Sequence, residues 1–177
     1  MRMNNISDQG LLDLTLVRTI PREEDREELR LAKGDVLLMG TNSEEKVGKA
    51  CVLLAEPDAP TLFSNHLYRL RVLDPRLTGE FLATYLHELW RSGFLAGRIR
   101  RWVNQAALQR ENLLSLPVPM VAPHRLATFT NQLHQIRGSE AQAAASAAKL
   151  ETLFQTLLHR AFTGELTARW REAHLRE

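Results

Sequence analysis

The chain has 177 residues, of which 44% are hydrophobic and 25% charged, a composition typical of a globular protein with one compact core. A net charge of +2 is only mildly basic, so the overall balance does not by itself indicate a nucleic-acid binder. The sequence contains no apolar run of membrane-spanning length and no signal-like leader, and the single Cys51 has no partner for an internal disulfide. We therefore expect a soluble, cytoplasmic chain.

The first half of the chain predicts a small β-sheet. Residues 11–20 are typical of an edge strand or irregular arm, and residues 21–30 of a turn and short charged helix. Residues 36–39 form a short apolar run after a glycine turn, and residues 47–55 predict the strand that returns beside it. A third strand is expected at residues 67–72, so this part of the chain supplies three neighbouring strands.

A helix is expected after the strands, followed by a basic segment. Thr78 is placed to cap a helix over residues 81–96. Its inward-facing residues should be Leu82, Leu86, Leu89 and Trp90. Residues 106–114 predict a short apolar helix or turn, and the prolines in residues 117–122 indicate a stiff connector.

The basic segment is the most informative polar stretch of the sequence. Four arginines cluster there with amide side chains and one tryptophan: Arg98, Arg100, Arg101, Arg110, Asn104, Gln105, Gln109 and Trp102. Guanidinium groups bind phosphates or guanine edges, and amides offer the paired donor and acceptor that adenine requires. The alternative is a solvated basic surface without a binding role.

The second half of the chain predicts one long helix with an apolar seam. The seam residues recur at alternating spacings of three and four, interrupted only by Glu140, and are Leu126, Phe129, Leu133, Ile136, Ala143, Ala147, Leu150, Phe154, Leu157 and Ala161. Such a repeat keeps one stripe against a second, supercoiled helix, and Leu153 and Leu158 widen it. Pro123 suits the start of the helix and Gly164 its left-handed end. The alternative is a long helix that packs on its own domain.

Motifs that would indicate catalysis are not evident in the sequence. No phosphate-binding glycine loop is present, and no histidine has metal-ligand spacing with acids or cysteine. Cys51 lies in an apolar stretch, which favours a small buried hydrophobe over a nucleophile. We therefore expect a chain that is not an enzyme and holds neither metal nor cofactor.

Three stretches together resemble the specificity subunit of type I restriction-modification systems. They are Lys33-Gly34-Asp35-Val36-Leu37 with the polar loop after it, Asn104-Gln105-Ala106-Ala107-Leu108 leading to Leu116-Pro117-Val118-Pro119, and residues 153–166 at the end of the long helix. The resemblance covers nearly all of this chain but about half of a typical member, which carries two recognition domains and two spacer helices. Members usually carry Glu-Gln shortly after the proline that opens the helix, where this chain has Leu126-Ala127.

The resemblance implies an α+β fold. A small mixed α/β target recognition domain (1–116) would be followed by the connector (117–122), a coiled-coil spacer helix (123–164) and a tail (165–177). A homodimer would bind an interrupted, palindromic double-stranded DNA target. Its partners would be a methyltransferase subunit that supplies S-adenosylmethionine and, optionally, a nuclease or translocase subunit. The alternative is an assembly element or decoy that occupies the methyltransferase without recognising DNA.

Within this hypothesis, the polar loop and the basic segment supply candidate DNA contacts, and the apolar seam supplies the contacts with partner helices. The expected DNA contacts are Thr41, Asn42, Ser43, Lys46, Lys49, Arg98, Arg100, Arg101, Asn104, Gln105, Gln109 and Arg110. The expected assembly surface is the seam, without Glu140, together with Leu153 and Leu158.

Overall fold

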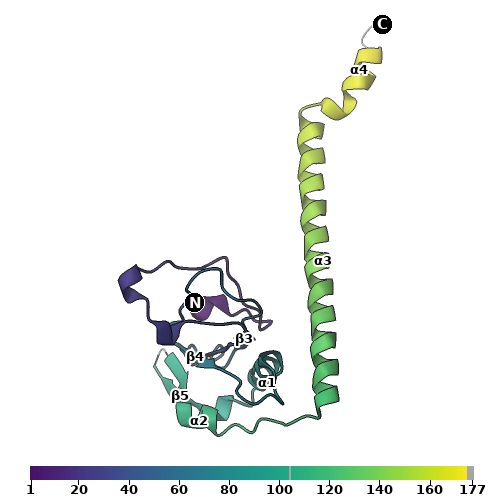
Figure 1. Cartoon of the computed structure of the whole chain (residues 1–177). Coiled ribbons are helices and arrows are strands. Elements are labelled where there is room, and N and C mark those ends of the chain that lie inside the picture. Colours follow the sequence, from purple (N-terminus) through teal and green to yellow (C-terminus); the bar gives the residue numbers. More distant parts are fainter. Residues whose placement is uncertain (104, 175–177) are drawn as a thin grey trace. The chain divides into compact units, whose positions relative to one another are not determined.

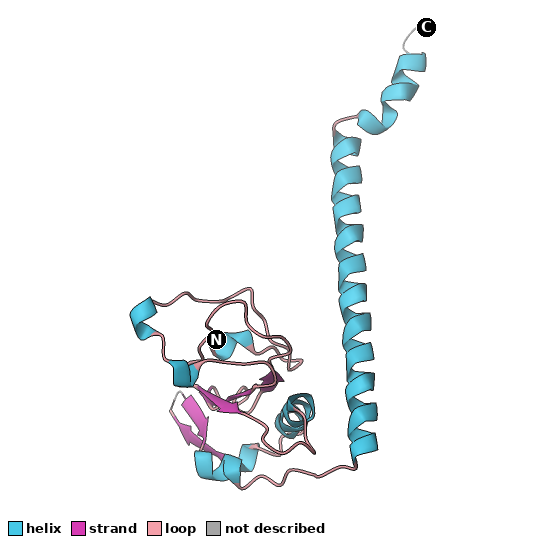
Figure 2. Ribbon diagram, in the orientation of Figure 1, coloured by secondary structure: helices cyan, strands magenta, loops and turns pink. Residues whose placement is uncertain are grey.

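The computed structural model describes residues 1–103 and 105–174, which form two compact units, Met1–Thr130 and Asn131–Glu177 (Figure 1). The first unit holds two small antiparallel sheets and two short helices, and the second is helical (Figure 2). The mixed α/β fold with a long C-terminal helix, predicted from the sequence, is confirmed.

The first sheet has the order β3-β1-β4. Its strands are β1 (Val36–Met39), β3 (Ala50–Val52) and β4 (Leu67–Leu70). β1 is buried on both faces because the sheet is covered on both sides: Val36 and Leu38 belong to the core cluster that includes α1, and Leu37 and Met39 pack with the N-terminal segment. Successive side chains point to opposite faces of a strand, and both faces of β1 are covered. Every position of β1 is therefore apolar, which explains the continuous apolar run in the sequence.

The strands predicted at residues 36–39, 47–55 and 67–72 are therefore present, although the second and third are shorter than expected. Gly48 adopts φ 99°, a conformation that favours glycine, and its N–H donates to the Met39 carbonyl at 2.8 Å. This turn delays regular pairing until Ala50, which lies opposite Leu38.

Helix α1 (Gly79–Arg91) is capped by Thr78 as predicted, because the Thr78 hydroxyl accepts a hydrogen bond from the Phe81 N–H at 3.1 Å, and it begins two residues before the predicted residue 81. It ends earlier than the predicted residue 96, since Gly93 adopts the left-handed conformation with φ 75°. Its inward face includes the predicted Leu86, and Ala83 and His87 are buried beside it. Figure 1 shows α1 next to β3.

The chain leaves the first sheet at Gly40 and enters the second, whose order is β2-β6-β5. The strands are β2 (Thr41–Asn42), β5 (Ile99–Trp102) and β6 (Gln105–Leu108), followed by helix α2 (Arg110–Leu114). A Cβ on Gly40 would lie 2.8 Å from the Tyr68 ring, so this crossing requires a residue without a side chain. The prediction of a helix or turn throughout residues 106–114 is wrong in its first half, because Ala106 and Ala107 pair with Arg101 and Arg100.

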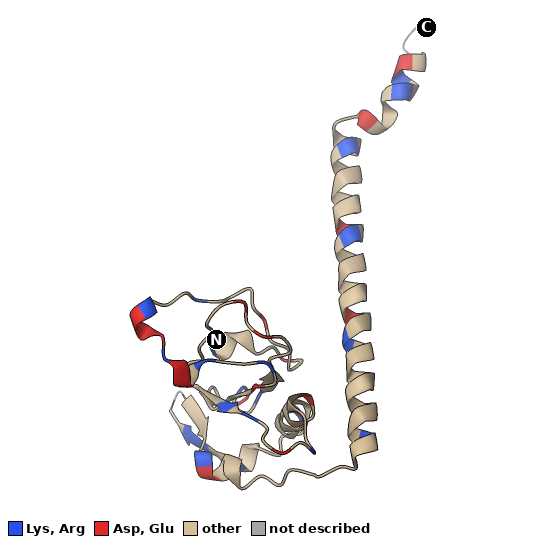
Figure 3. Cartoon of the chain, viewed as in Figure 1, with Lys and Arg blue, Asp and Glu red and all other residues tan. Residues whose placement is uncertain are grey.

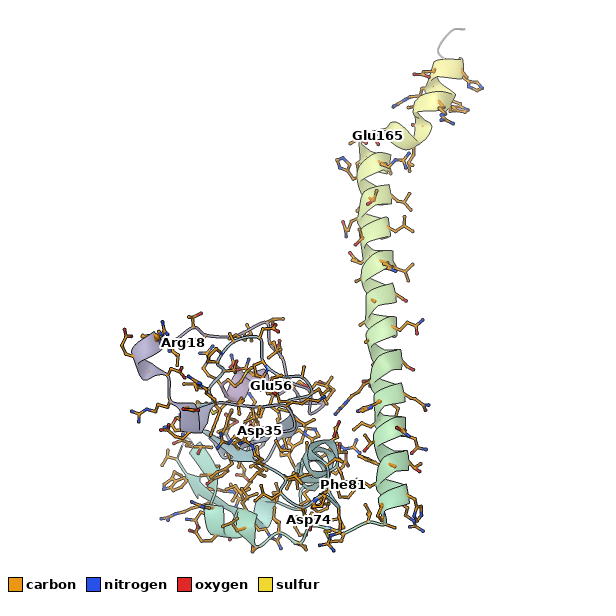
Figure 4. All side chains as sticks on the ribbon, viewed as in Figure 1. Arg18, Asp35, Glu56, Asp74, Phe81 and Glu165 are labelled. Carbon is orange, nitrogen blue, oxygen red and sulfur yellow. The ribbon has the colours of Figure 1, made fainter. Side chains whose placement is uncertain are left out.

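The N-terminal part of the unit is largely irregular. Short 3-10 helices lie at Met3–Asn5, Arg22–Glu24 and Glu27–Leu29, and the expected arm at residues 11–20 has one isolated bridge, between Leu12 and Ile6. Within the first sheet, an ion pair joins the residue before β1 to the residue after β4. Arg71 donates to both Asp35 carboxylate oxygens at 2.7 Å, and Asp35, labelled in Figure 4, is 1% exposed.

The long helix α3 spans Pro123–Phe162, within one or two residues of its predicted ends. Within the first unit, Leu126 is buried and the Phe129 ring meets Phe81 edge-on, with centroids 5.5 Å apart. Gly164 follows the helix with φ 75°, as its predicted left-handed stop requires. The helical second unit continues through a 3-10 turn at Glu165–Thr167 to α4 (Ala168–His174).

Candidate nucleic-acid interface

The second sheet divides its residues between an inner and an outer face. Ile99, Ala106 and Leu108 pack into the core, so the face they share is the inner one. Alternation places Arg100, Trp102 and Gln105 on the opposite face, where the last two lie directly across from each other. Thr41 pairs with Ala107 and joins this outer face from β2.

The outer face carries groups suited to polynucleotide binding. The Arg100 guanidinium lies over the Trp102 ring, 5.2 Å from its centroid, and the ring is half exposed. Such stacking holds a cation at the surface without neutralising it. Gln105 supplies an exposed amide with a donor and an acceptor. Figure 3 shows the basic residues of β5 in blue beside strands with few charges.

Arg101 occupies a different position from Arg100. It lies on the inner side of β5, and its guanidinium makes an ion pair with Glu44 (2.5 Å) and donates to the Ala96 carbonyl (3.3 Å). The hydrogen bond from Arg101 lowers the pKa of the Glu44 carboxyl and raises that of the guanidinium. Arg101 is therefore a cation already engaged by a carboxylate at the margin of the sheet.

Two of the expected DNA contacts at the end of β2 and in the loop after it, Asn42 and Ser43, make hydrogen bonds to nearby protein groups. The Asn42 amide donates to the Met39 sulfur (3.1 Å) and its oxygen accepts from the Ser43 N–H (2.7 Å). The Ser43 hydroxyl donates to Glu45 at 2.6 Å, which lowers the pKa of that carboxyl. Lys46 is exposed. Of the expected loop contacts, Lys46 presents the most accessible cation.

Lys49, expected at the DNA surface, lies in the interior. It is 4% exposed, makes an ion pair with Asp8 and lies 5.0 Å from the Trp90 ring centroid. His87 Nε2 is 3.1 Å from the Asp8 carbonyl, while its Nδ1 accepts from the Ala50 N–H. These contacts hold the N-terminal segment against the core. The position of Lys49 therefore supports a structural role for this residue.

The remaining expected contacts flank the hairpin. Arg98 stacks on Phe94, 4.1 Å from the ring centroid, and donates to the Phe94 carbonyl at 3.2 Å. Gln109 and Arg110 are exposed at the first turn of α2. Asn104, between β5 and β6, lies outside the described residues. The structure thus brings the basic segment and the 41–46 loop together on one small sheet.

The expected assembly surface is accessible along most of its length. Leu126 is buried and Phe129 and Leu133 are partly buried, whereas Ile136 and every later member are exposed. Exposed fractions reach 66% for Leu150, 57% for Phe154 and 42% for Leu157. Large apolar side chains at these exposures form an exposed apolar stripe along the helix.

The chain is similar to a putative type I restriction enzyme MjaX specificity subunit from Methanocaldococcus jannaschii, with 27% identity over 121 residues. The match covers 67% of this chain and 28% of that protein, so the matched part is less than a third of the relative's length. No protein-family model matches the chain. The name of this distant relative agrees with the family that the sequence motifs resemble.

Within residues 1–103 and 105–174, no group of three or more His, Cys, Asp and Glu side chains is arranged to hold a metal ion. In the same part of the chain, no helix has the length and hydropathy needed to cross a membrane. Cys51 is 1% exposed, and burial raises the pKa of its thiol to about 12, as expected for a packing residue.

Sequence reasoning missed Glu44 and the Asp8–His87 pair. Glu44 meets Arg101 from 57 positions away in the chain, and only the pairing of β2 with β6 reveals that neighbourhood. A weak signal was present: an acidic pair, Glu44 and Glu45, interrupts an otherwise polar and basic loop. His87 lies on the inward face of α1, where its two ring nitrogens contact the Ala50 N–H and the Asp8 carbonyl instead of solvent.

Proposed function

We propose that this chain is a DNA sequence-specificity subunit that directs a type I DNA methyltransferase to its target. The observation that carries the proposal is the outer face of the β5–β6 hairpin. There Arg100, Trp102 and Gln105 offer a cation, an aromatic ring and an amide together, while the opposite face packs the core. These are the groups that bind phosphates and base edges.

The long helix supplies the second part of the proposal. Two copies would pair along the seam through α3, with the alanine-rich middle allowing close approach. A twofold pair of recognition domains would then bind a bipartite, palindromic DNA target with a fixed separation between its halves. The same helices would form the docking surface for the methyltransferase, and a nuclease or translocase subunit would join in the restriction complex.

In this proposal the chain has no catalytic role. S-adenosylmethionine would be bound by the methyltransferase, and methyl transfer would take place there. What this chain contributes is the position of the complex on DNA, through phosphate contacts that fix its register and base contacts that select sequence.

A second candidate is an assembly element that binds the methyltransferase without recognising DNA sequence. Two observations favour it: Lys49 is buried against Asp8, and Arg101 is engaged by Glu44, so two of the expected DNA-binding cations are occupied within the fold. In this case the long helix would carry the whole function.

Selection from a pool of randomised DNA duplexes, with the chain and its methyltransferase both present, separates these candidates. A specificity subunit should enrich two short half-sites at constant separation, at moderate salt where non-specific binding is weak. Enrichment of no sequence, with the complex intact, would contradict DNA recognition and support the assembly element. The matched control is the methyltransferase alone in the same pool.

A further inference from the structure

The ion pair between Arg101 and Glu44 lies at the margin of the second sheet, on the inner side of β5 and opposite the face that carries Arg100, Trp102 and Gln105. Arg101, Ala106 and Asn42 form one row across β5, β6 and β2, and Glu44 follows two residues after Asn42. The Arg101 guanidinium therefore reaches from the edge strand β5 toward the end of β2. The side chains of Arg101 and Glu44 keep exposed fractions of 54% and 49%, so both groups remain in contact with solvent.

The neighbouring charged residues are arranged differently. Glu45 accepts a hydrogen bond from the Ser43 hydroxyl, and its carbonyl accepts one from Trp90 Nε1 at 2.8 Å. Arg100, one residue before Arg101, has its guanidinium over the Trp102 ring. Glu44 thus engages one specific cation, and the adjacent carboxylate does not share that role.

We propose that Glu44 is a specificity-determining residue, which holds Arg101 away from DNA phosphates until a correctly bound target brings a phosphate close enough to replace the carboxylate. This inference rests on the proposed function, since it concerns how the same sheet, at its margin, would discriminate between DNA sequences.

The physical basis is competition between two anions for one guanidinium. Non-specific binding comes almost entirely from cations that neutralise phosphates. A cation paired with a carboxylate contributes little to it, and the carboxylate itself repels the DNA backbone. In a specific complex, base contacts fix the register of the hairpin on the duplex, so that a phosphate can be held next to Arg101. Glu44 therefore lowers affinity for wrong sequences more than affinity for the right one, a use of repulsion to gain specificity.

The test compares Glu44→Gln with Glu45→Gln, which removes the same charge one residue away. Both are measured with the methyltransferase present, on the selected target and on an unrelated duplex, over a range of salt concentrations. Glu44→Gln should strengthen binding to the unrelated duplex by about fivefold to tenfold near 0.1 M salt and steepen the salt dependence there by about 0.9, the value of one added phosphate contact. Glu45→Gln should change both much less, and the target should gain less than the unrelated duplex.

Arg101→Ala provides the complementary measurement. It should reduce the salt slope for the target by about 0.9 and leave the slope for the unrelated duplex unchanged, because Arg101 contacts phosphate only in the specific complex. Combined with Glu44→Gln, it should abolish the gain in non-specific binding. In the free chain, Arg101→Ala should also raise the pKa of Glu44, measured by NMR, since that carboxyl loses its hydrogen-bond donor.

The two proposals fail in different ways. Equal effects of Glu44→Gln and Glu45→Gln, in a complex whose wild-type form still selects a sequence, would overturn the role of Glu44 alone. A wild-type complex without sequence preference would overturn the proposed function, and this inference with it. An Arg101→Ala variant with reduced slopes on both duplexes would also contradict the inference, because Arg101 would then be an ordinary phosphate contact.

Discussion

Replacing Leu150 with glutamate should separate the two copies of the proposed dimer. Leu150 is 66% exposed, so about two thirds of its side chain remains to be buried by a partner. Full burial of a leucine side chain contributes about 1.5–3 kcal/mol, which leaves about 1–2 kcal/mol for this residue in each copy. A twofold dimer contains the residue twice, so the loss is about 2–4 kcal/mol, or about 30-fold to 1000-fold in the dissociation constant.

Sedimentation over a concentration series measures this loss directly. Thr152→Glu is the matched control, because it adds the same charge to the same helix at a heptad position outside the seam. Leu150→Glu should dissociate at concentrations where wild type and Thr152→Glu remain dimers, while all three keep their helical signal. A wild-type chain that sediments as a monomer, or two variants that dissociate alike, would refute the assignment of the seam.

Three further predictions concern the first unit. Arg100→Ala should weaken binding to the selected DNA and lower its salt slope by about 0.9, and an unchanged slope would remove Arg100 from the contact set. Gly40→Ala should destabilise the fold by about 1–3 kcal/mol in denaturant titrations, because the new Cβ would press on Tyr68, whereas Gly97→Ala, with open space around it, should be nearly neutral. Cys51 should resist alkylation at pH 8, where a thiol of pKa about 12 is about one part in ten thousand thiolate, until the chain unfolds; labelling of the native protein would contradict its burial.

Much of the fold follows from local sequence patterns. The run at residues 36–39 is apolar at every position because β1 is covered on both faces, and the caps at Thr78 and Gly164 act through short-range chemistry. The long helix is evident from its repeat alone. Such features can be predicted because neighbouring residues determine them.

The β5–β6 hairpin could not be predicted in the same way. No glycine stands between Trp102 and Gln105 in the sequence to mark a tight hairpin, and Gln105-Ala106-Ala107-Leu108 has residues that favour a helix. Pairing with Arg100 and Arg101 on one side and with β2 on the other satisfies this backbone as a strand. Tertiary contacts here override local preference.

The candidate site was predicted by residue type but not by orientation. The cluster of arginines and amides indicated a polar surface, but no local pattern separates the outward Arg100 from Arg101, which binds Glu44. It also could not place Lys49 inside, because its partner Asp8 comes from a segment with no regular pattern. The face of the sheet on which a side chain lies depends on strand register, and register depends on residues far away in the sequence.

Under the proposed function, the alternation of β5 and β6 affects how the chain could acquire new DNA targets. Ile99, Ala106 and Leu108 maintain the interior, while Arg100, Trp102 and Gln105 alternate with them and make no contribution to the core cluster. Mutations at the second group should therefore cost less folding free energy than mutations at the first. A combinatorial library randomised at those three positions should yield mostly folded proteins, and its members should differ in the DNA they prefer.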